Sequence, residues 1–578
     1  MGKPRPAVFA ALTVAFVAAA VVWTVTSASA LSMTFDEPHH LATGIEWWQF
    51  GTYRWWTENP PLPKVLTALG PYLTGVRLPA RPTADTSVWN TGIHLVEAGG
   101  ARTLMLARLG TLPWLLLALG FTFALAGGRA QIRYAFLATA LCATYPPLLG
   151  HAGLATTDVA AVATVLGFLL ALDRWAARPT LGRAAVVGVA LALAALCKLT
   201  APLLCAVLAV AWLCGRRMAG GRWLGEGGPW PRARALIAQA ALAATAMLIV
   251  VWAGYRFSVG RLEDLPAMSY LGTPALPPPD KRGALLTWLA RVPLPAPEFW
   301  HGFLFLKAHD AHGHLAYLFG ATREHGFRSF YLVGLALKSP VSFLLLVFVA
   351  VAAAFGPIGR RALGARGGGA ALAAVGALLF SAIITVNIGL RHMLIVVPLL
   401  SIFVARALGS WIESLAPPRQ VMGGAAIGLL LAIQIVVVER ARPELMAFFN
   451  PLAGAEPGRA LIDSDLDWGQ DMRLLQRDLA ARGVKELHYG LFGIVNPCDP
   501  AWPKIIPLEP GKPVTGWVVL SEQFYRSGLH FSFRRASCET DARYQFHVDP
   551  ADAFDWLKGM EPAGRVGASL RVYWVAGR

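Results

Sequence analysis

Apolar residues over the first three quarters of the chain come in uninterrupted runs, not in the alternation of a half-exposed strand. A run of about 20 such residues is long enough to cross a bilayer as a helix. The short pair 184–197 and 201–214 is interrupted at Lys198-Leu199-Thr200-Ala201-Pro202, which also suits a hairpin of incomplete helices. The predicted spans are 7–30, 104–126, 134–150, 157–173, 184–197, 201–214, 235–256, 329–355, 369–388, 391–405 and 420–438.

Residues 439–578 lack such runs and mix short strand-like and helix-like patterns. An amphipathic helix is predicted from Gln470 to Ala481, and a second helix near Ala551–Met560. The predicted strands are Ala460–Ile462, Glu486–Phe492, Trp517–Leu520 and Leu570–Val575. The chain therefore divides into a helical part, 1–438, and a small α/β domain, 439–578.

Composition agrees with this division. Of 578 residues, 56% are hydrophobic and 15% are charged, against about 25% charged residues in ordinary soluble domains. These values exclude a disordered chain, a coiled coil and a typical soluble enzyme. We predict a polytopic α-helical membrane protein of about eleven spans with a C-terminal α/β domain.

The positive charge lies on the hydrophobic part. The chain has a net charge of +17, yet residues 439–578 hold 17 basic and 18 acidic residues. The predicted inner segments hold 17 basic and two acidic residues, whereas the outer loops 31–103 and 257–328 hold six acids each. This bias predicts a cytoplasmic N-terminus and an extracytoplasmic C-terminal domain, which requires an odd number of spans, eleven or thirteen. It argues against a nucleic-acid partner.

Two features bear on the compartment. Residues 1–30 read either as a retained helix or as a signal peptide that ends at Ala28-Ser29-Ala30, and we expect retention because the apolar run is long. An outward C-terminal domain permits disulfides, so Cys498 and Cys538 are predicted to pair. The multi-pass chain is expected in a bacterial inner membrane.

The first outer loop opens with Asp36-Glu37-Pro38-His39-His40, directly after the first span. Acids at a membrane boundary are costly unless they are used or paired. A carboxylate here can take a proton from an acceptor hydroxyl. Asp36 as a helix N-cap with Pro38 in the first turn explains the pattern equally well.

The same loop continues with tryptophan pairs and then Glu58-Asn59-Pro60-Pro61-Leu62-Pro63-Lys64. The tryptophans either stack on a sugar or lie in the interfacial belt of a membrane protein, and the belt is favoured. Arg54 and Lys64 are candidates for contact with a lipid phosphate, and snorkelling towards the membrane surface is the alternative for Lys64.

Three further sites carry charge beside apolar runs. Asp158 lies at the predicted outer end of a span, where an N-cap is the alternative to a catalytic role. Lys198 lies within the interrupted pair, and Arg391-His392 stands at the outer edge of another span. Lys198 is a functional candidate, with snorkelling from a shallow hairpin as the alternative, and Arg391-His392 either binds an anion or anchors the helix.

The outer domain opens with an aspartate-rich run, Asp463-Ser464-Asp465-Leu466-Asp467-Trp468-Gly469-Gln470-Asp471. Such a run suits Ca²⁺, but it lacks the glycine and terminal glutamate of an EF-hand loop, so a capping turn is favoured. The chain contains no P-loop, GxGxxG, metal-type CxxC or HExxH pattern. Nothing in it indicates a nucleotide site.

In order along the chain, these segments resemble bacterial relatives of the dolichyl-phosphate-mannose–protein mannosyltransferases. Those belong to the C-type glycosyltransferase superfamily, as does the lipid A aminoarabinose transferase. The resemblance is carried by Asp36-Glu37, Glu58-Asn59-Pro60-Pro61-Leu62, Thr157-Asp158, Lys198, Tyr317-Leu318-Phe319-Gly320, Lys338-Ser339-Pro340, Gly389-Leu390-Arg391-His392 and Asp465-Leu466-Asp467-Trp468-Gly469-Gln470-Asp471.

The resemblance implies a polyprenyl-phosphate sugar donor that is used on the non-cytoplasmic face. It implies that Asp36 is the catalytic base, that Glu37 positions the acceptor or the base, and that Asp158 is the second acid. Relatives often carry His or Lys before the Pro-Pro pair, where this chain has Asn59, so Lys64 is the expected substitute. The donor-binding set is then Arg54, Glu58, Lys64, Lys198, Arg391 and His392.

The expected function is inverting transfer of a sugar to an acceptor hydroxyl on a protein, lipid or glycan. Two other classes stay open: a transporter or flippase of lipid-linked sugars, and a non-catalytic partner in cell-envelope assembly. A transporter usually carries inverted repeats, and no second broken hairpin matches the first. The sequence leaves open which sugar moves and whether a divalent metal takes part.

Overall fold

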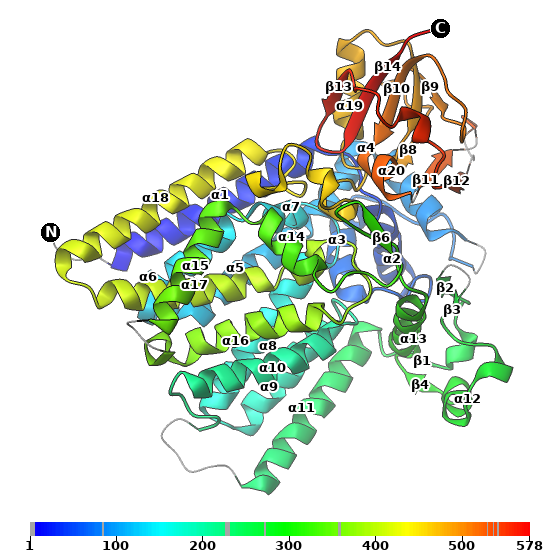
Figure 1. Ribbon diagram of the computed structural model, residues 1–578. Helices are drawn as coiled ribbons and strands as arrows, with labels where there is room; N and C mark the ends of the chain where they lie inside the picture. Colours follow the sequence, from blue (N-terminus) through cyan, green and yellow to red (C-terminus); the bar gives the residue numbers. More distant parts are fainter. Residues whose placement is uncertain are drawn as a thin grey trace.

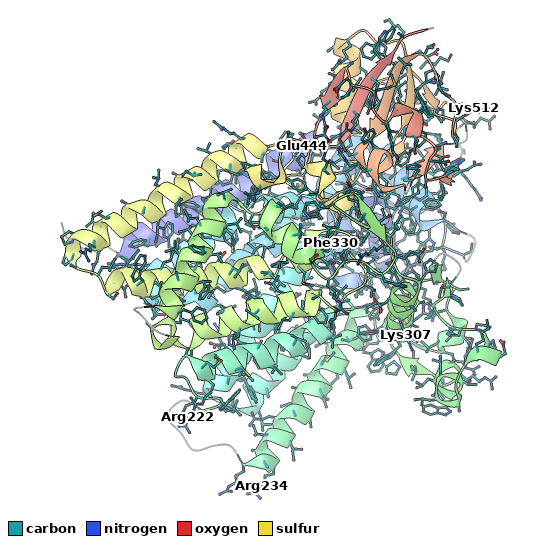
Figure 2. The ribbon with its side chains drawn as sticks, viewed as in Figure 1. Arg222, Arg234, Lys307, Phe330, Glu444 and Lys512 are labelled. Atoms are coloured by element: carbon teal, nitrogen blue, oxygen red, sulfur yellow. A yellow bond between two sulfur atoms is a disulfide. The ribbon has the colours of Figure 1, made fainter. Side chains whose placement is uncertain are left out.

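The computed structural model describes residues 6–83, 86–225, 232–270, 273–356, 360–528, 530–535, 537–539 and 543–577. Long helices lie side by side in a bundle, and a small domain rich in strands stands at one end (Figure 1). The first helix starts at the other end of the bundle, far from this domain. Figure 2 places Arg222 and Arg234 away from the small domain that carries Lys512.

Among the described residues, eight helical stretches are long and apolar enough to cross a membrane. They lie at eight of the eleven predicted positions. They are α1 (Pro6–Ala30), α4 with α5 (Val88–Leu109 and Leu112–Ala126), α8 (Asp158–Ala177), α10 (Ala201–Met218), α11 (Ala233–Gly254), α16 (Gly364–Ser381), α17 (Val396–Glu413) and α18 (Pro417–Ala441).

The other three predicted spans are helical but short or broken. The run 134–150 forms α6 (Ile132–Ala143) and α7 (Pro146–Ala152), because a proline has no N–H to continue a helix. α14 (Phe330–Lys338) and α15 (Val341–Phe355) meet at 113° across Ser339-Pro340, and counting this pair as one span gives nine. α9 (Leu181–Ala195) is short. The count of eleven and the orientation stay predictions.

The interrupted pair does not pack as a simple hairpin. α9 packs against α8 and α11, whereas α10 packs mainly against α16. Lys198 therefore lies in the turn between two helices that diverge into different parts of the bundle.

The outer loops hold short elements. The first carries α2 (Glu37–Phe50) and α3 (Pro61–Leu73), which pack against each other and against α4. The second carries α12 (Ala284–Arg291), α13 (Pro297–His312) and the strands β1 (Val259–Gly260), β2 (Ser269–Tyr270), β3 (Thr273–Pro274), β4 (Leu294–Pro295), β5 (Ala316–Leu318) and β6 (Ala321–Arg323).

The C-terminal domain contains two sheets. The larger has the order β13-β14-β10-β7-β9, and the smaller β12-β11-β8. α19 (Met472–Ala481) buries Leu475 and Leu479 against the larger sheet, and α20 (Glu522–Ser527) follows β10. The strands are β7 (Glu486–Gly490), β8 (Gly493–Val495), β9 (Lys504–Pro507), β10 (Gly516–Ser521), β11 (His530–Arg535), β12 (Tyr544–Asp549), β13 (Gly564–Val566) and β14 (Leu570–Val575).

Two predicted elements of this domain are wrong. Residues 460–462 form no strand, because Asp463 takes a left-handed backbone (φ 58°) and turns the chain into a short 3₁₀ helix. Residues 551–560 form turns and a 3₁₀ helix, Asp555–Leu557, in place of an α-helix. The helix of Met472–Ala481 and the strands β7, β10 and β14 are confirmed, as is the Cys498–Cys538 disulfide.

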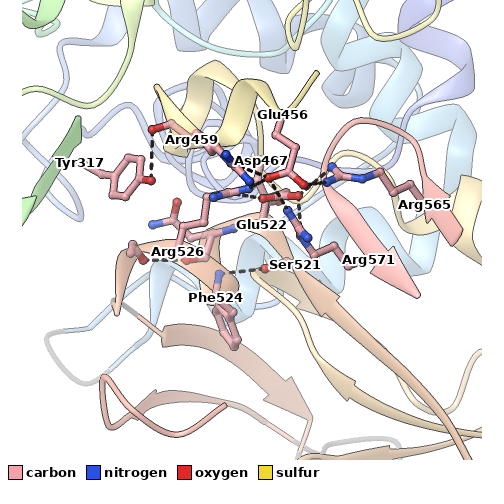
Figure 3. Close-up of polar contacts among 12 residues, drawn as sticks. Tyr317, Glu456, Arg459, Asp467, Ser521, Glu522, Phe524, Arg526, Arg565 and Arg571 are labelled. Atoms are coloured by element: carbon pink, nitrogen blue, oxygen red, sulfur yellow. Dashed lines mark hydrogen bonds and ion pairs between the residues drawn. The ribbon is translucent and has the colours of Figure 1, made fainter. Parts of the chain in front are cut away.

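A network of ion pairs ties the segment between α18 and α19 to the rest of the C-terminal domain (Figure 3). Glu522, which begins α20, is buried, whereas Glu456 lies in that segment and is partly exposed, and four arginines pair with one or both of them. Tyr317 of β5 donates a hydrogen bond to the carbonyl oxygen of Arg459 at 3.3 Å, which ties the second outer loop to the same network. The arginines are Arg459, Arg526, Arg565 and Arg571.

Candidate functional site

Asp36 stands at the entry of α2, where the chain leaves α1 and enters the first outer loop. It occupies the N-cap position, but its side chain makes no capping hydrogen bond. Its Oδ2 instead lies 3.1 Å from Nη1 of Arg391. The N-cap reading therefore does not explain this carboxylate, which remains available for chemistry.

Glu37, the next residue, is held very differently. Its two oxygens accept hydrogen bonds from the Arg108 guanidinium at 2.8 and 2.7 Å, and from the backbone N–H groups of Thr34 and Ala155. Burial raises the pKa of Glu37, but Arg108 outweighs burial and holds the pKa below its usual range. Glu37 thus fastens the segment that carries Asp36 to α4 and α7–α8.

Alternating charges form a chain from Asp36 into the bundle. Arg391 lies 3.1 Å from Asp36 and 3.6 Å from Asp158, and Lys198 lies 3.0 Å from Asp158. Four predicted residues that are far apart in the sequence therefore meet at one place. Asp158 is buried, so its charge depends on these two cations.

The C-terminal domain positions Arg391. The ring of Trp468 lies 4.1 Å from the centre of the Arg391 guanidinium. Asp465 accepts a hydrogen bond from the backbone N–H of Leu390 at 3.0 Å, and its Oδ1 lies 3.6 Å from the fully buried ammonium of Lys338. The Lys338 and Asp465 motifs are thus joined, and they hold the turn that presents Arg391.

The charges of Lys64 and Glu58 also interact with the region around Asp36. Lys64 comes early in α3, whose start is set by the prolines, and its Nζ is buried without a hydrogen-bond partner. Burial lowers the pKa of Lys64 to about 7. Burial also raises the pKa of Glu58 to about 6, with the charge of Asp36 adding to the rise. Both groups therefore change charge close to neutral pH.

Several other polar atoms near Asp36 are buried and unpaired. His39 and His40 have rings 4.1 Å apart, and both ring nitrogens of His39 lack a partner, as does Nδ1 of His40. Burial is the main reason that the pKa values of both imidazoles lie well below their usual range. Unsatisfied polar atoms are costly, so this region is suited to a polar ligand or to ordered water.

Two predicted donor-binding residues, His392 and Arg54, lie in different places. His392 is adjacent to Arg391 and interacts electrostatically with Lys198 and Asp158. Arg54 is turned away from the group, because its Nε pairs with Glu298 of α13 at 3.4 Å and its side chain is 44% exposed. Arg54 therefore does not join Asp36 in this structure.

No described group of three or more His, Cys, Asp or Glu side chains is arranged to hold a metal ion. The aspartate-rich run is used in hydrogen bonds: Asp467 accepts from the N–H groups of Gln523 and Gly469, and Asp471 accepts from Ser569. Protein donors occupy these oxygens, so the described residues of the run do not fit a bound Ca²⁺.

Three residues of the site were not predicted. Arg108 could have been found, because a charged residue within the run 104–126 calls for a partner. Trp468 belongs to the aspartate-rich motif, but nothing in that motif indicates that its ring lies against Arg391. His309 of α13, whose Nδ1 lies 4.0 Å from Glu58, gave no signal, since lone histidines in outer loops are common.

No family model matches the chain, and no curated protein matches it. Among solved structures, it is similar to ArnT from Cupriavidus metallidurans bound to undecaprenyl phosphate, with 15% identity, 97% of each chain covered and a TM-score of 0.44. It is also similar to the apo Archaeoglobus fulgidus oligosaccharyltransferase, with 12% identity, 76% of this chain and 55% of that chain covered, and a TM-score of 0.41. These neighbours are members of the C-type glycosyltransferase fold.

Proposed function

We propose that this protein is an inverting glycosyltransferase that moves a sugar from a polyprenyl phosphate to an acceptor hydroxyl. The proposal rests on one observation: Asp36, Arg391, Asp158 and Lys198 lie together. The Asp36 carboxylate, which has a single arginine contact, therefore lies beside cations. The ordered motifs of the sequence, which resemble lipid-carrier glycosyltransferases, support the same chemistry. The non-cytoplasmic location of the site follows from the predicted orientation.

In the proposed reaction, Asp36 accepts the proton of the acceptor hydroxyl as its oxygen bonds to the anomeric carbon. The bond between that carbon and the phosphate oxygen breaks, and its electron pair leaves with the lipid phosphate. Burial raises the pKa of Asp36 above its usual range despite the neighbouring Arg391, and a more basic carboxylate accepts a proton more readily.

Arg391 has a double role in this scheme. Without donor, its guanidinium pairs with both Asp36 and Asp158, and Lys198 supplies the second positive charge beside Asp158. A donor phosphate competes for the same guanidinium, because phosphate accepts charge-assisted hydrogen bonds from arginine. Binding of donor would thus loosen the Asp36–Arg391 pair and free Asp36 for the acceptor. Lys198 and Lys64 would offset the charge that develops on the leaving phosphate.

Glu37 is assigned the role of a positioning residue. It does not face the reacting atoms in the proposal, because four hydrogen bonds from Arg108 and two backbone N–H groups occupy its oxygens. Its function is to fix the direction of the adjacent Asp36. Arg54 is not included among the phosphate contacts, since it pairs with Glu298.

The test uses the purified full-length protein in lipid with a panel of radiolabelled polyprenyl-phosphate sugars. Release of free polyprenyl phosphate that depends on added acceptor is the expected result, and the active donor names the sugar. Tight binding of a donor without any release would instead favour a flippase or an assembly partner.

A further inference from the structure

An apolar groove runs along the bundle, away from the site around Asp36. α8 packs against both α5 and α9, and residues of all three helices line the groove. Its volume is about 730 Å³. Its lining is almost entirely apolar and includes Leu117, Phe121, Gly167, Leu170, Val186 and Val189. Leu117, Val186 and Val189 are each more than a third exposed, so the groove opens to the surroundings of the bundle.

One end of the groove carries two cations. Arg174, near the end of α8, and Arg183, near the start of α9, both line it. Arg183 donates a hydrogen bond to the carbonyl oxygen of Arg174 at 2.6 Å. Among the described residues, no carboxylate forms an ion pair with either side chain; the adjacent Asp173 pairs instead with Arg216 and Arg366. The two guanidinium groups are therefore available to an anion.

This end lies opposite the candidate active site. Asp158 begins α8, and Arg174 lies near its end, about 24 Å further along the helix at ~1.5 Å per residue. In the predicted orientation, Arg174 and Arg183 are at the cytoplasmic surface of the membrane. A ligand that suits the groove has an anionic head at this surface and an apolar chain that extends towards the middle of the bilayer.

We propose that the groove binds an acidic phospholipid of the cytoplasmic leaflet, with its phosphate between Arg174 and Arg183 and an acyl chain between α5 and α9. Arginine suits this head group because its planar fork matches phosphate oxygens, and basic residues beside the cytoplasmic leaflet attract anionic lipids. The inference does not depend on the proposed glycosyltransferase activity.

Trp114, near the start of α5, also lines the groove. The polyprenyl tail of a donor is a rival occupant, since it is also a long apolar chain. Its phosphate, however, would lie at the Asp158 end, and a tail alone leaves the two unpaired arginines without a role.

The test measures binding of phosphatidylglycerol and phosphatidylcholine to the full-length protein in detergent, by native mass spectrometry and by thermal stabilisation. The variants are the double change Arg174→Gln with Arg183→Gln, and Val186→Trp, which fills the groove from an exposed position that tolerates a larger side chain. Arg419→Gln is the matched control, because Arg419 is an exposed arginine near the start of α18, on the same predicted side of the membrane.

Wild type and Arg419→Gln are expected to retain phosphatidylglycerol in preference to phosphatidylcholine and to melt at higher temperature with it. The double variant and Val186→Trp should each retain at least fivefold less phosphatidylglycerol. Equal retention by the double variant and wild type would overturn the proposal. So would weaker binding of polyprenyl phosphate to Val186→Trp with phosphatidylglycerol binding unchanged, an outcome that assigns the groove to the donor tail.

Discussion

Asp36 and Glu37 are neighbours in the sequence, but their carboxylates have opposite surroundings. Glu37 is saturated by hydrogen bonds, and its pKa lies below the usual range despite burial. Asp36 has one arginine contact, and burial raises its pKa. A saturated carboxylate suits a structural role, whereas a carboxylate with one exchangeable contact suits proton transfer.

Replacement of Glu37 by Gln tests the structural half of this contrast. The change leaves the buried Arg108 charge without its partner, which typically costs about 3–5 kcal/mol. The melting temperature of the purified protein should fall clearly, and Glu324→Gln, an exposed change in the second outer loop, should leave it unchanged.

The pH dependence of stability carries the same signature. Because the folded-state pKa of Glu37 is lowered, its stabilising contribution is complete above its ordinary pKa and is lost as the pH falls through the folded value. On acidification, the melting temperature of wild type should therefore fall more than that of Glu37→Gln. Parallel acid losses in the two proteins would contradict this role.

The charge of Lys64 should make use of the donor depend on pH. Its pKa of about 7 means that it is charged below neutral pH and loses its charge above it. If this charge binds the donor phosphate, kcat/KM for the donor should fall as the pH rises through 7. Lys64→Arg, which keeps its charge at all these pH values, should move that fall to higher pH. Superimposable profiles of the two proteins would exclude Lys64 from donor binding.

The individual charges of the site could be predicted, but their pairings could not. Asp158, Lys198 and Arg391 stand beside apolar runs, where an unpaired charge is costly, so each was a candidate from the sequence. The sequence did not show that Arg391 bridges two aspartates, or that Arg54 turns to Glu298, because these contacts join residues hundreds of positions apart.

At the scale of elements, the segment that opens the C-terminal domain decides where Arg391 points. Asp465 binds the turn at Leu390, Trp468 lies over the Arg391 guanidinium, and Lys338 at the end of α14 is buried against Asp465. Prolines explain why the helices around this point are short, since Pro340 ends α14 and Pro146 separates α6 from α7.

Lys338→Met should destabilise the protein, because it leaves Asp465 buried without its cation. The cost of breaking such a pair is typically about 3–5 kcal/mol, whereas an apolar replacement of both partners is often close to neutral. The double change Lys338→Met with Asp465→Leu should therefore melt at a higher temperature than Lys338→Met alone. A double variant that is no better than the single would show that the ion pair is not the cause.

Local sequence patterns predicted the helices and strands of the C-terminal domain better than its turns. The amphipathic pattern of Met472–Ala481 and the apolar strands β7, β10 and β14 report burial directly. The chain at 460–462 has the residues of a strand, but the left-handed turn at Asp463 removes it from any sheet. At this turn the backbone N–H of Asp463 donates to Oε1 of Gln523, a residue 60 positions away, and no local pattern contains that contact.

In the whole molecule, the basic segments lie away from the C-terminal domain, as the predicted orientation requires. Arg222 and Arg234 lie at a distance from the domain of Lys512 (Figure 2), as expected if basic segments face the cytoplasm. The candidate site lies between the outer loops and the C-terminal domain, and the lipid groove reaches its arginines at the opposite end of α8.

Cysteine labelling tests this orientation. In sealed right-side-out vesicles, a membrane-impermeant maleimide should label Lys512→Cys rapidly and Arg222→Cys only after permeabilisation, because both positions are exposed on the protein. Cys142, Cys197 and Cys205 are buried, so they should contribute little background, and the half-buried Cys214 is replaced by serine in both variants. Rapid labelling of Arg222→Cys in sealed vesicles would reverse the orientation and the predicted side of the site.

Substitution of Asp36 tests directly whether this carboxylate accepts the proton of the acceptor hydroxyl. Release of polyprenyl phosphate is measured for wild type, Asp36→Asn and Asp280→Asn, an exposed carboxylate of the second outer loop, together with donor binding and melting temperature. We expect Asp36→Asn to fold and to bind donor, yet to turn over on the order of 10²–10⁴-fold more slowly, while Asp280→Asn matches wild type. Near wild-type turnover by folded Asp36→Asn would show that Asp36 is not the base.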